Sequence, residues 1–220
     1  MEAGDSPSEL QALWASEYRD RGFTVIERAV PDWVAGTWCG IFEAYVATGA
    51  RRVDIKDERG EVSDGIGGRL FYDLIDGISC EKLAPDMLRL YRRLPASLRQ
   101  ITQQAVICSP YERSKVCGKI YPAGGGQQGA HFDTNGITVI LYLTSNNDGC
   151  TVIRPLDGGP DVSVKPAAGN ILLMRGRECW HHAAPAIEKP KVISAWNYYV
   201  EGDTWRPDGL DDQIYGKLQS

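Results

Sequence analysis

The residue types best suited to metal chemistry occur at two places in this 220-residue chain, which contains three histidines. The first place is His131-Phe132-Asp133 and the second is His181-His182. Residues two apart on a strand point to the same face, whereas adjacent residues point to opposite faces. Two imidazoles and one carboxylate on one face of an octahedron are a ligand set for non-haem Fe(II), with three positions left open. The sequence therefore predicts an iron site made of His131, Asp133 and one member of the later pair.

Three further side chains could hold a small anion beside such a metal. Lys191 enters the last long strand expected, Tyr121 ends the strand before His131, and Tyr142 lies on the strand after Asp133. An ammonium and two phenols could bind a dicarboxylate whose α-keto acid end chelates the iron and whose far carboxylate pairs with the lysine. The alternatives are a solvated strand-end lysine and a tyrosine that packs in the core.

Short apolar runs separated by turn residues follow one another from about residue 107. They are rich in Val, Ile, Tyr and Thr, and they cover residues 114–121, 136–143, 150–153, 162–164, 170–174 and 192–200. Short strands at this spacing are typical of a sandwich or barrel. We therefore expect a mostly β fold, a jelly roll (double-stranded β-helix) packed against N-terminal helices, which would position the metal ligands on its strands.

The N-terminal half shows apolar stripes at helical spacing. One stripe predicts a helix that stops at Gly22, and a second helix opens at Pro31 and ends at Gly49. Two more helices are expected at residues 82–93 and 95–106, each with a proline near its start. These helices are expected to support the strands that carry the site.

The segments between and after these helices complete the predicted layout. A short strand is expected at residues 23–26, and residues 50–68, charged and then glycine-rich, predict a mobile surface loop. Its glycines beside Arg69 could form a lid whose arginine meets an acidic substrate, or simply a solvated loop. We predict one domain over residues 1–220, with helical support (1–106), a jelly-roll core (107–200) and a C-terminal tail (201–220).

The composition excludes several classes of function. Twenty-four basic against 29 acidic residues give a net charge of −5, so no nucleic-acid partner is expected. No run approaches the roughly 18 apolar residues of a membrane span, and no signal peptide is recognised, which predicts a cytoplasmic protein with no membrane partner. Six scattered cysteines without a C-x-x-C pair indicate reduced thiols. The sequence does not encode the oligomeric state.

A glycine-rich stretch at residues 124–129 matches the G-x-G-x-x-G pattern of dinucleotide-binding proteins. That fingerprint requires a helix immediately after it, because the helix N-terminus meets the pyrophosphate. Here the stretch is followed by His131, Asp133 and a turn, which indicate strand rather than helix. We interpret it as a flexible loop crossing the mouth of the barrel, with no nucleotide bound.

The order of the motifs over residues 114–200 resembles the Fe(II)/2-oxoglutarate-dependent oxygenases, most closely their prolyl-4-hydroxylase-like branch. The motifs are Tyr121-Pro122, His131-Phe132-Asp133, Ile140-Leu141-Tyr142-Leu143, Gly169-Asn-Ile-Leu-Leu-Met174, His181-x-x-x-Pro185, Lys191 and Ile193-Ser194-Ala195-Trp196. The H-x-x-x-P spacing in this resemblance selects His181 rather than His182 as the third ligand.

The resemblance also implies roles for individual residues. Iron would be bound by His131, Asp133 and His181, the distal carboxylate of 2-oxoglutarate by Lys191 with help from Tyr142, and the pocket would be lined by Tyr121. In related proteins the basic residue and the tryptophan lie on one side of the last strand. Lys191 and Trp196 are five apart, so a regular strand would separate them, whereas a bulge near Pro190 would bring them together.

The activity implied by the resemblance is that of an enzyme using Fe(II), 2-oxoglutarate and O2. Such an enzyme hydroxylates, desaturates or cyclises an unactivated C–H bond and releases succinate. Related halogenases have Gly or Ala where this chain has Asp133, so we expect hydroxylation rather than halogenation. The expected substrate is a small molecule, such as an amino acid or a natural-product intermediate. The alternatives are a protein prolyl or other side-chain hydroxylase, a cupin-type metalloenzyme that does not use 2-oxoglutarate, and a non-catalytic binding module.

Overall fold

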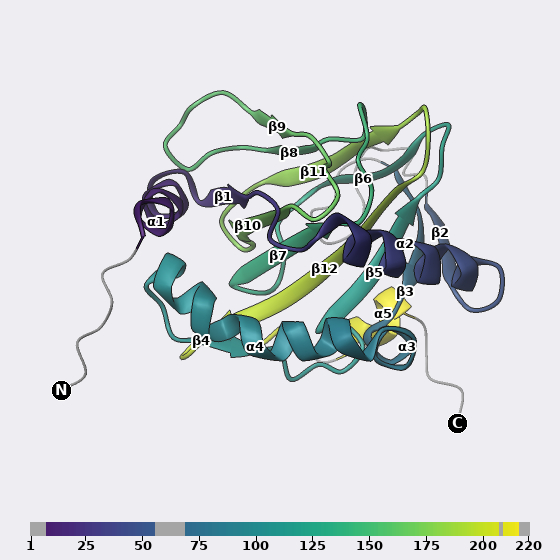
Figure 1. Cartoon of the computed structure of the whole chain (residues 1–220), viewed down its shortest axis with the longest axis horizontal. Helices are drawn as coiled ribbons and strands as arrows, with labels where there is room; N and C mark the ends of the chain where they lie inside the picture. Colours follow the sequence, from purple (N-terminus) through teal and green to yellow (C-terminus); the bar gives the residue numbers. More distant parts are fainter. Residues whose placement is uncertain (1–7, 56–68, 207–208, 216–220) are drawn as a thin grey trace.

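The computed structural model of the chain describes residues 8–55, 69–206 and 209–215. Its helices are α1 (Glu9–Arg21), α2 (Asp32–Val46), α3 (Gly77–Leu83), α4 (Pro85–Thr102) and α5 (Leu210–Tyr215). Its strands are β1 (Phe23–Ile26), β2 (Arg51–Ile55), β3 (Leu70–Ile75), β4 (Val106–Cys108), β5 (Val116–Tyr121), β6 (Gly126–His131), β7 (Ile137–Tyr142), β8 (Thr151–Ile153), β9 (Val162–Val164), β10 (Ile171–Arg175), β11 (His181–Ala186) and β12 (Lys191–Val200). Figure 1 shows their arrangement.

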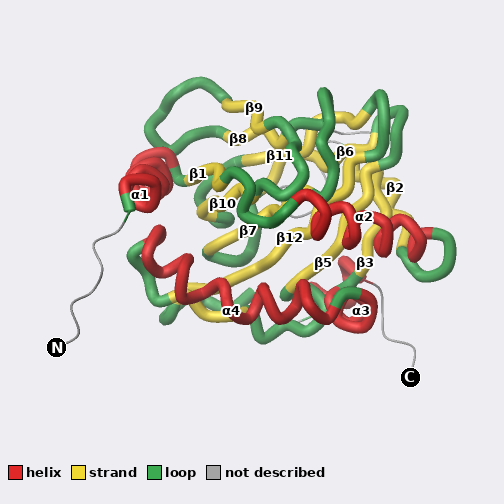
Figure 2. Tube along the Cα trace, viewed as in Figure 1, coloured by secondary structure: helices red, strands yellow, loops and turns green. Residues whose placement is uncertain are grey.

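The strands form a curled antiparallel sheet that folds back over itself. One part runs in the order β1-β10-β7-β12-β5-β3, with β4 added to β12 and β2 added to β3. The other part runs β6-β11-β8-β9 and joins the first through the pairing of Phe71 with Gln127. Helices α2 and α4 lie across one face of the larger part (Figure 2). The expected jelly roll packed against N-terminal helices is therefore confirmed.

Two apolar cores hold these layers together. The first lies between the helices and the larger part of the sheet, and includes Phe42, Leu88 and Trp196. The second lies between the two parts of the sheet, and includes Tyr121 and Tyr142. Strands β7 and β12 contribute to both cores and are buried on both faces, so they read as continuous apolar runs rather than alternating ones.

Helix α1 has well-defined signals at both ends. The Ser8 side chain accepts from the Gln11 backbone N–H, and the Gln11 side chain accepts from the Ser8 N–H, which makes a capping box. Gly22 ends the helix with a φ of 82° and donates to the Tyr18 carbonyl. A Cβ at Gly22 would lie 2.6 Å from the sulfur of Cys179, so both the backbone conformation and the space favour glycine.

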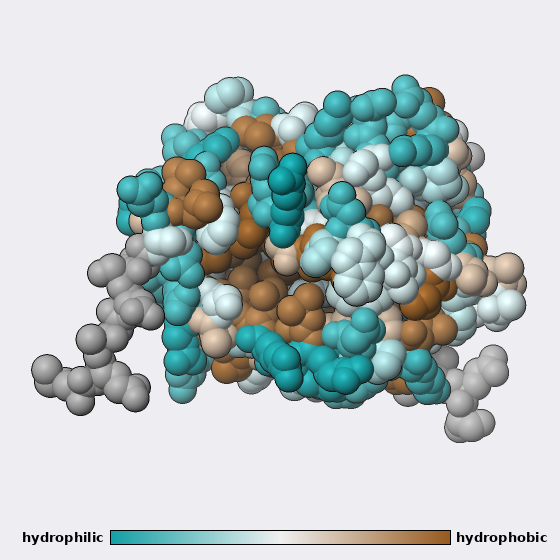
Figure 3. Space-filling view, viewed as in Figure 1, coloured by the Kyte–Doolittle hydropathy of each residue, from teal (hydrophilic) through white to brown (hydrophobic). Residues whose placement is uncertain are grey.

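Residues 85–102 form one helix, α4, where two helices divided near Pro95 were expected; that expectation is wrong. A proline inside a helix removes the N–H that would bond to the carbonyl four residues earlier. Here the carbonyl is that of Tyr91, and the buried Tyr198 hydroxyl donates to it over 2.8 Å. The tertiary hydrogen bond replaces the missing one and lets the helix continue. In Figure 3 the outward side of α4 is hydrophilic, and apolar side chains gather between it and the neighbouring segments.

The expectations about the loops are wrong in part, and one of them concerns residues that the structure does not describe. Residues 51–55 of the predicted mobile loop form β2, which pairs with β3, and residues 56–68, including the glycines of the proposed lid, lie outside the described residues. Arg69 forms an ion pair with Asp54 at 3.1 Å. The stretch interpreted as a flexible loop at the barrel mouth contributes β6, a strand between β3 and β11, because its backbone is paired on both sides.

The remaining features concern the ends and the thiols. The described part of the first 106 residues is mainly helical but also supplies β3, which lies between β5 and β6 in the sheet. The C-terminal segment, expected as a polar tail, contains the short helix α5. All six cysteines are free. Within the described parts of the chain, none of the helices has the length and apolar character needed to cross a membrane.

Candidate metal centre

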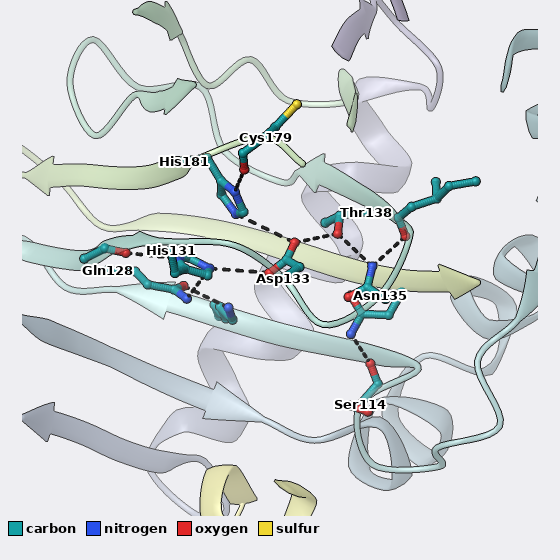
Figure 4. Close-up of polar contacts among 12 residues, drawn as sticks. Ser114, Gln128, His131, Asp133, Asn135, Thr138, Cys179 and His181 are labelled. Atoms are coloured by element: carbon teal, nitrogen blue, oxygen red, sulfur yellow. Dashed lines mark hydrogen bonds and ion pairs between the residues drawn. The ribbon is translucent and has the colours of Figure 1, made fainter. Parts of the chain in front are cut away.

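The pairing of β6 with β11 brings the two distant histidine positions together. His131 and His181 are direct partners in the register of these strands, and their ring centroids lie 4.3 Å apart. Asp133 follows β6, and its backbone N–H donates to the Gly176 carbonyl over 2.8 Å, which fixes the turn that carries it. One ligand atom from each of His131, Asp133 and His181 can be chosen so that all lie within 4.8 Å of one another. Figure 4 shows the three side chains converging.

The hydrogen bonds of the two imidazoles determine which nitrogen is free. Nδ1 of His131 lies 2.8 Å from the Gly129 carbonyl, and Nδ1 of His181 lies 3.0 Å from the Cys179 carbonyl. A carbonyl only accepts, so both Nδ1 atoms carry the proton in the neutral rings and both Nε2 atoms present lone pairs. Backbone carbonyls that orient ligand imidazoles in this way are a common outer shell of metal sites.

Both Nε2 lone pairs face the carboxylate of Asp133. His131 Nε2 lies 3.4 Å from Oδ1, and His181 Nε2 lies 3.7 Å from Oδ2. Burial lowers the pKa of His181 to about 4, so this ring is neutral at pH 7. Burial acts to raise the pKa of Asp133, but His181, His131 and the Thr138 hydroxyl outweigh it and hold that pKa below its ordinary value. Three electron-rich donors so close together form a site that a cation would stabilise.

The spacing of the donors fits a metal ion of the first transition row. Metal–nitrogen and metal–oxygen bonds of about 2.1 Å at right angles hold two donors about 3 Å apart. The separations of 3.4 and 3.7 Å between the carboxylate and the two imidazoles exceed this value by less than 1 Å, and all three donors lie within 4.8 Å of one another. Two imidazoles and one carboxylate are the donor set of the facial triad of Fe(II).

The carboxylate of Asp133 is held by Thr138 of β7, which is itself held by Asn135 from the segment before that strand. The Thr138 hydroxyl donates to its Oδ2 over 2.5 Å, and Asn135 Nδ2 donates to the Thr138 oxygen over 2.8 Å. A Cβ added at Gly176 would lie 2.5 Å from that Thr138 oxygen and 3.0 Å from the Asp133 Cβ. These contacts orient the carboxylate toward the histidines, as Figure 4 shows.

His182, the alternative third ligand, is not in the cluster of potential ligands found among the described residues. It is partnered with Val152 in the β11–β8 ladder and is half-buried. Its ring still borders the cavity beside the cluster. The structure thus places His181 next to His131 and Asp133 and leaves His182 outside this cluster. The choice of His181 as the third ligand stays a prediction.

Lys191 lies in the same cavity, at the start of β12. It is 1% exposed, and its Nζ donates to the Gly149 carbonyl over 2.7 Å. Its partner in the β12–β5 ladder is Tyr121, and Nζ lies 4.2 Å from the centre of that ring. Burial lowers the pKa of Lys191 to about 7. Within the described residues this ammonium forms no ion pair, so the cavity contains a buried cation that an anion would stabilise.

The β12–β5 ladder is regular from Lys191 to Trp196, so the bulge considered near Pro190 is not present along these paired residues. Lys191 faces the cavity, while Trp196 belongs to the core under the helices and packs edge-on against Tyr91. The two side chains therefore point to opposite faces. The lysine reaches the cavity because the regular alternation puts it on the same face as Ile193 and Ala195.

Of the two tyrosines predicted to lie at the site, one lines the cavity and the other lies behind its wall. Tyr121 lines the cavity, and its hydroxyl donates to Gln128 Oε1 over 3.1 Å. Tyr142 is fully buried beneath the cavity wall, and its hydroxyl donates to Thr151 Oγ1 over 2.8 Å. Thr151 lines the cavity, and because its oxygen already accepts from Tyr142, its own proton is available for another acceptor. Tyr142 thus reaches the cavity through Thr151.

The cavity has a volume of about 420 Å³. The triad, Lys191 and Tyr121 share its lining with several residues that the sequence reasoning missed: Tyr72, Lys119, Gln128, Asn197, Arg206, Leu210, Ile214 and Tyr215. Lys119 could have been recognised, since it lies two residues before Tyr121 on one strand. The residues of α5 had no signal in the local pattern, because only the fold brings the C-terminal segment to the cavity.

Gln128 illustrates a contact that strand alternation predicts wrongly. It lies three positions before His131, so a regular strand would turn the two side chains to opposite faces. The β6–β11 register shifts between the His181–His131 pair and the Ala183–Gln128 pair, which is a bulge. As a result, Gln128 Nε2 lies 3.1 Å from His131 Nε2 in the cavity. Since that imidazole nitrogen carries the lone pair, the amide donates to it.

Comparison with known proteins supports the fold. No protein-family model and no curated protein matches the chain. Among solved structures, it is similar to the α-ketoglutarate-dependent epimerase SnoN from nogalamycin biosynthesis, with 15% identity and a TM-score of 0.69 over 93% of this chain and 88% of that one. It is also similar to a Pseudomonas putida prolyl-4-hydroxylase, with 16% identity and a TM-score of 0.60 over 86% and 98% of the two chains.

A third similar structure is EctD from S. alaskensis, with 14% identity and a TM-score of 0.63 over 94% of this chain and 81% of that one. The EctD structure contains 2-oxoglutarate and 5-hydroxyectoine. The likeness to these proteins extends over most of the chain. It shows that the chain has the fold of the non-haem 2-oxoglutarate oxygenases.

Proposed function

We propose that this protein is an Fe(II)- and 2-oxoglutarate-dependent dioxygenase that oxidises an unactivated C–H bond of a small molecule. One observation carries the proposal: two imidazole lone pairs and a carboxylate converge in a cavity that also contains a buried ammonium without an ion-pair partner among the described residues. The fold supports it, because the similar structures include a SnoN complex with Fe3+ and α-ketoglutarate.

Under this proposal His131, Asp133 and His181 hold the metal. They occupy one face of an octahedron, and the other three coordination positions stay open. When bound, Fe(II) and 2-oxoglutarate supply the oxidising chemistry, in which O2 is consumed, 2-oxoglutarate becomes succinate and carbon dioxide, and a C–H bond is oxidised. The chain itself supplies orientation and exclusion of water. Because Asp133 keeps a carboxylate at the metal, the expected outcome is hydroxylation, desaturation or ring closure rather than halogenation.

Lys191 is proposed to bind the distal carboxylate of 2-oxoglutarate. A buried ammonium next to a carboxylate forms a charge-assisted hydrogen bond, and the anion removes the penalty of an isolated buried charge. The Tyr121 ring, with its centre 4.2 Å from Nζ, stabilises the ammonium through a cation–π contact. Thr151, held by the Tyr142 hydroxyl, has a proton to donate to the same carboxylate. In this arrangement Tyr142 is a positioning residue and Thr151 makes the contact.

The shape of the cavity favours a small molecule over a protein substrate. Helix α5 contributes Leu210, Ile214 and Tyr215 to its lining. This helix is fixed by contacts such as that of Arg113 Nη2 with the Tyr215 carbonyl at 2.8 Å. A similar SnoN structure contains nogalamycin RO, whereas a similar prolyl hydroxylase contains a peptide fragment of hypoxia inducible factor.

The proposal is tested by an anaerobic titration with Fe(II) and 2-oxoglutarate, followed by admission of O2. We expect the visible metal-to-ligand charge-transfer band of the chelate, and then release of succinate. The Asp133→Ala variant should lose both, while Asp157→Ala, an exposed aspartate, should behave like the parent. Equal consumption of 2-oxoglutarate by parent and Asp133→Ala refutes the triad. Metal binding without the band or succinate points instead to a cupin-type enzyme that does not use 2-oxoglutarate.

Substrate class is tested separately. Panels of metabolites and of prolyl peptides are added to the loaded enzyme, and succinate release above the uncoupled background is measured. Stimulation by metabolites is the expected result. Stimulation by peptides alone would identify a protein hydroxylase of the same chemistry.

A further inference from the structure

We propose that Lys119 is the substrate-binding cation of this cavity and that the substrate is a small monocarboxylic acid with an apolar or aromatic body. This inference rests on the proposed function and extends it to the class of substrate. It is carried by the position of Lys119, by the balance of charge in the cavity, and by the residues that surround both.

Lys119 points into the cavity from β5. It lies two residues before Tyr121 on the same face of the strand, and it lines the cavity. Its Nζ donates to Gln128 Oε1 over 2.8 Å and lies 5.4 Å from the centre of the Tyr72 ring. Both partners are neutral, and the described residues provide no ion pair for it. A charged amine facing a cavity with neutral partners only is a ready site for an anion.

The protonation of Lys119 differs from that of Lys191. Burial acts to lower the pKa of Lys119, but Tyr121, Tyr72, Cys117 and Asp133 outweigh it and raise that pKa above its ordinary value. Lys119 is therefore an ammonium at pH 7. Lys191, whose pKa is lowered to about 7 by burial, is the cation that depends on an incoming anion for its charge. The two lysines are thus suited to two different anions.

The balance of charge leaves Lys119 without a counter-ion once the cavity is loaded. The two positive charges of the metal together with that of Lys191 equal the charge of Asp133 plus the two carboxylates of 2-oxoglutarate. Asp133 is the sole carboxylate among the described residues that line the cavity. The charge of Lys119, a half-buried residue, is then left over, and an unbalanced charge facing a cavity is unfavourable. One substrate carboxylate balances it, whereas a dianionic phosphate would leave an excess.

The other two cations of the lining are already engaged with α5. Arg206 Nη2 forms an ion pair with Asp211 Oδ1 at 2.5 Å. Arg51 donates to the Ile214 carbonyl over 2.5 Å, and the residue is exposed to solvent, where its charge is hydrated. Neither competes with Lys119 for the substrate anion.

The position of Lys119 places the anion near the metal. Gln128 links the two, with its oxygen 2.8 Å from Lys119 Nζ and its nitrogen 3.1 Å from His131 Nε2. Two hydrogen bonds and one amide span at most about 8 Å. A carboxylate on Lys119 therefore brings carbons a few bonds away from it close to the open coordination positions.

The other residues that line the cavity indicate what the rest of the substrate is like. Tyr72 and Tyr215 are aromatic, and Leu70, Leu74 and Ile140 are aliphatic. The lining offers no second carboxylate, within the described residues, for the ammonium of a free amino acid. The geometry thus favours carboxylic acids without a free α-amino group, with an apolar or aromatic body against these walls.

The test compares acids with their amides. Anaerobic protein is loaded with Fe(II) and 2-oxoglutarate, and benzoate, phenylacetate, 3-phenylpropanoate and hexanoate are each titrated beside the matching primary amide. Binding is measured by calorimetry and by perturbation of the charge-transfer band. We expect at least one acid to bind at least about tenfold more tightly than its amide, as one charge-assisted hydrogen bond allows.

The variants assign that preference to one residue. Lys119→Met should abolish the preference for the acid while still forming the chelate with Fe(II) and 2-oxoglutarate, and Lys119→Arg should retain the preference. The control is Lys189→Met, which removes an exposed lysine. An acid preference that survives in Lys119→Met, or the absence of any acid preference in the parent, overturns the inference. Loss of 2-oxoglutarate binding in Lys119→Met also overturns it, since Lys119 would then hold the co-substrate.

The design separates this inference from the proposed function. If the parent forms no chelate with Fe(II) and 2-oxoglutarate, the proposed function fails before any acid is added, and the charge balance assigned to Lys119 fails with it. If the chelate forms and acids bind no better than amides, the proposed function stands and only the role of Lys119 fails.

Discussion

Replacing Lys191 with methionine is expected to stabilise the ligand-free protein at neutral and acidic pH while removing its binding of 2-oxoglutarate. The ammonium is 1% exposed and donates to the Gly149 carbonyl. Burial lowers its pKa from 10.5 to about 7, so the folded state disfavours the charge that the unfolded chain carries freely. Methionine keeps most of the volume of the side chain and has no charge to desolvate.

The magnitude follows from the change in pKa. A fall from 10.5 to about 7 corresponds to about 5 kcal/mol of destabilisation. Because the pKa is lowered on folding, the unfolded chain binds more protons between about pH 7 and pH 10.5. The penalty is therefore fully present below about pH 7 and disappears as the pH rises toward 10.5. Against it stands the Gly149 carbonyl, which loses its donor in the variant at a cost of about 1–3 kcal/mol.

The difference between variant and parent should thus change sign with pH. Near pH 6 the variant should be more stable by about 3 kcal/mol, which for a chain of this size raises Tm by roughly 6–12 °C. Near pH 10 the lysine penalty falls below about 1 kcal/mol, and the variant should be equal or slightly less stable. Comparing two proteins at each pH cancels the titration of all other groups.

The assay is thermal unfolding followed by circular dichroism, with metal-free protein, a chelator and a thiol reductant at both pH values. Lys189→Met is the matched control, because this neighbouring lysine is exposed and should give no pH-dependent difference. A Lys191→Met variant that is less stable than the parent at pH 6, or a difference that is the same at pH 6 and pH 10, refutes the buried-charge reasoning. Retention of 2-oxoglutarate binding by the variant refutes the proposed role of Lys191.

Three further outcomes are expected. The affinity for 2-oxoglutarate should fall about tenfold per pH unit above about pH 7, because the co-substrate needs protonated Lys191; a flat profile in calorimetric titrations contradicts this. Tyr198→Phe should destabilise the protein by about 1–3 kcal/mol in urea unfolding, since the Tyr91 carbonyl loses its replacement donor; an unchanged midpoint argues against that hydrogen bond. Gln128→Leu should bind Fe(II) severalfold more tightly in chelator competition, because the amide donor no longer competes for the ligand nitrogen, whereas Gln127→Leu should match the parent.

The parts of the molecule that follow from short-range pattern were predictable from the sequence. The alternation and turn residues after residue 107 gave most strands of the jelly roll, and the glycine after α1 marked the end of that helix. The grouping of His131, Asp133 and His181 could be predicted for a related reason. His131 and Asp133 share a face through strand periodicity, and few histidines were available as partners.

The parts that depend on long-range contacts were not predictable in the same way. Pro95 indicates a helix break when only its neighbours are considered, and the hydroxyl that compensates for it comes from β12. The glycine-rich stretch before His131 resembles a loop because its backbone partners, β3 and β11, are distant in sequence. The place of the α5 residues in the cavity lining could not be predicted either, because it also depends on contacts between segments that are distant in sequence.

Gln128 connects the metal centre to the second lysine in a way that only the fold reveals. Its amide nitrogen donates to the lone pair of His131 that a metal requires, while its oxygen accepts from Lys119 and Tyr121. A lone pair serves one partner at a time, so a metal at His131 and the Gln128 donor exclude each other. Metal binding therefore changes the hydrogen bonding of the residue that holds Lys119. The bulge in β6 that turns Gln128 into the cavity is thus the feature that couples the metal site to the proposed anion site.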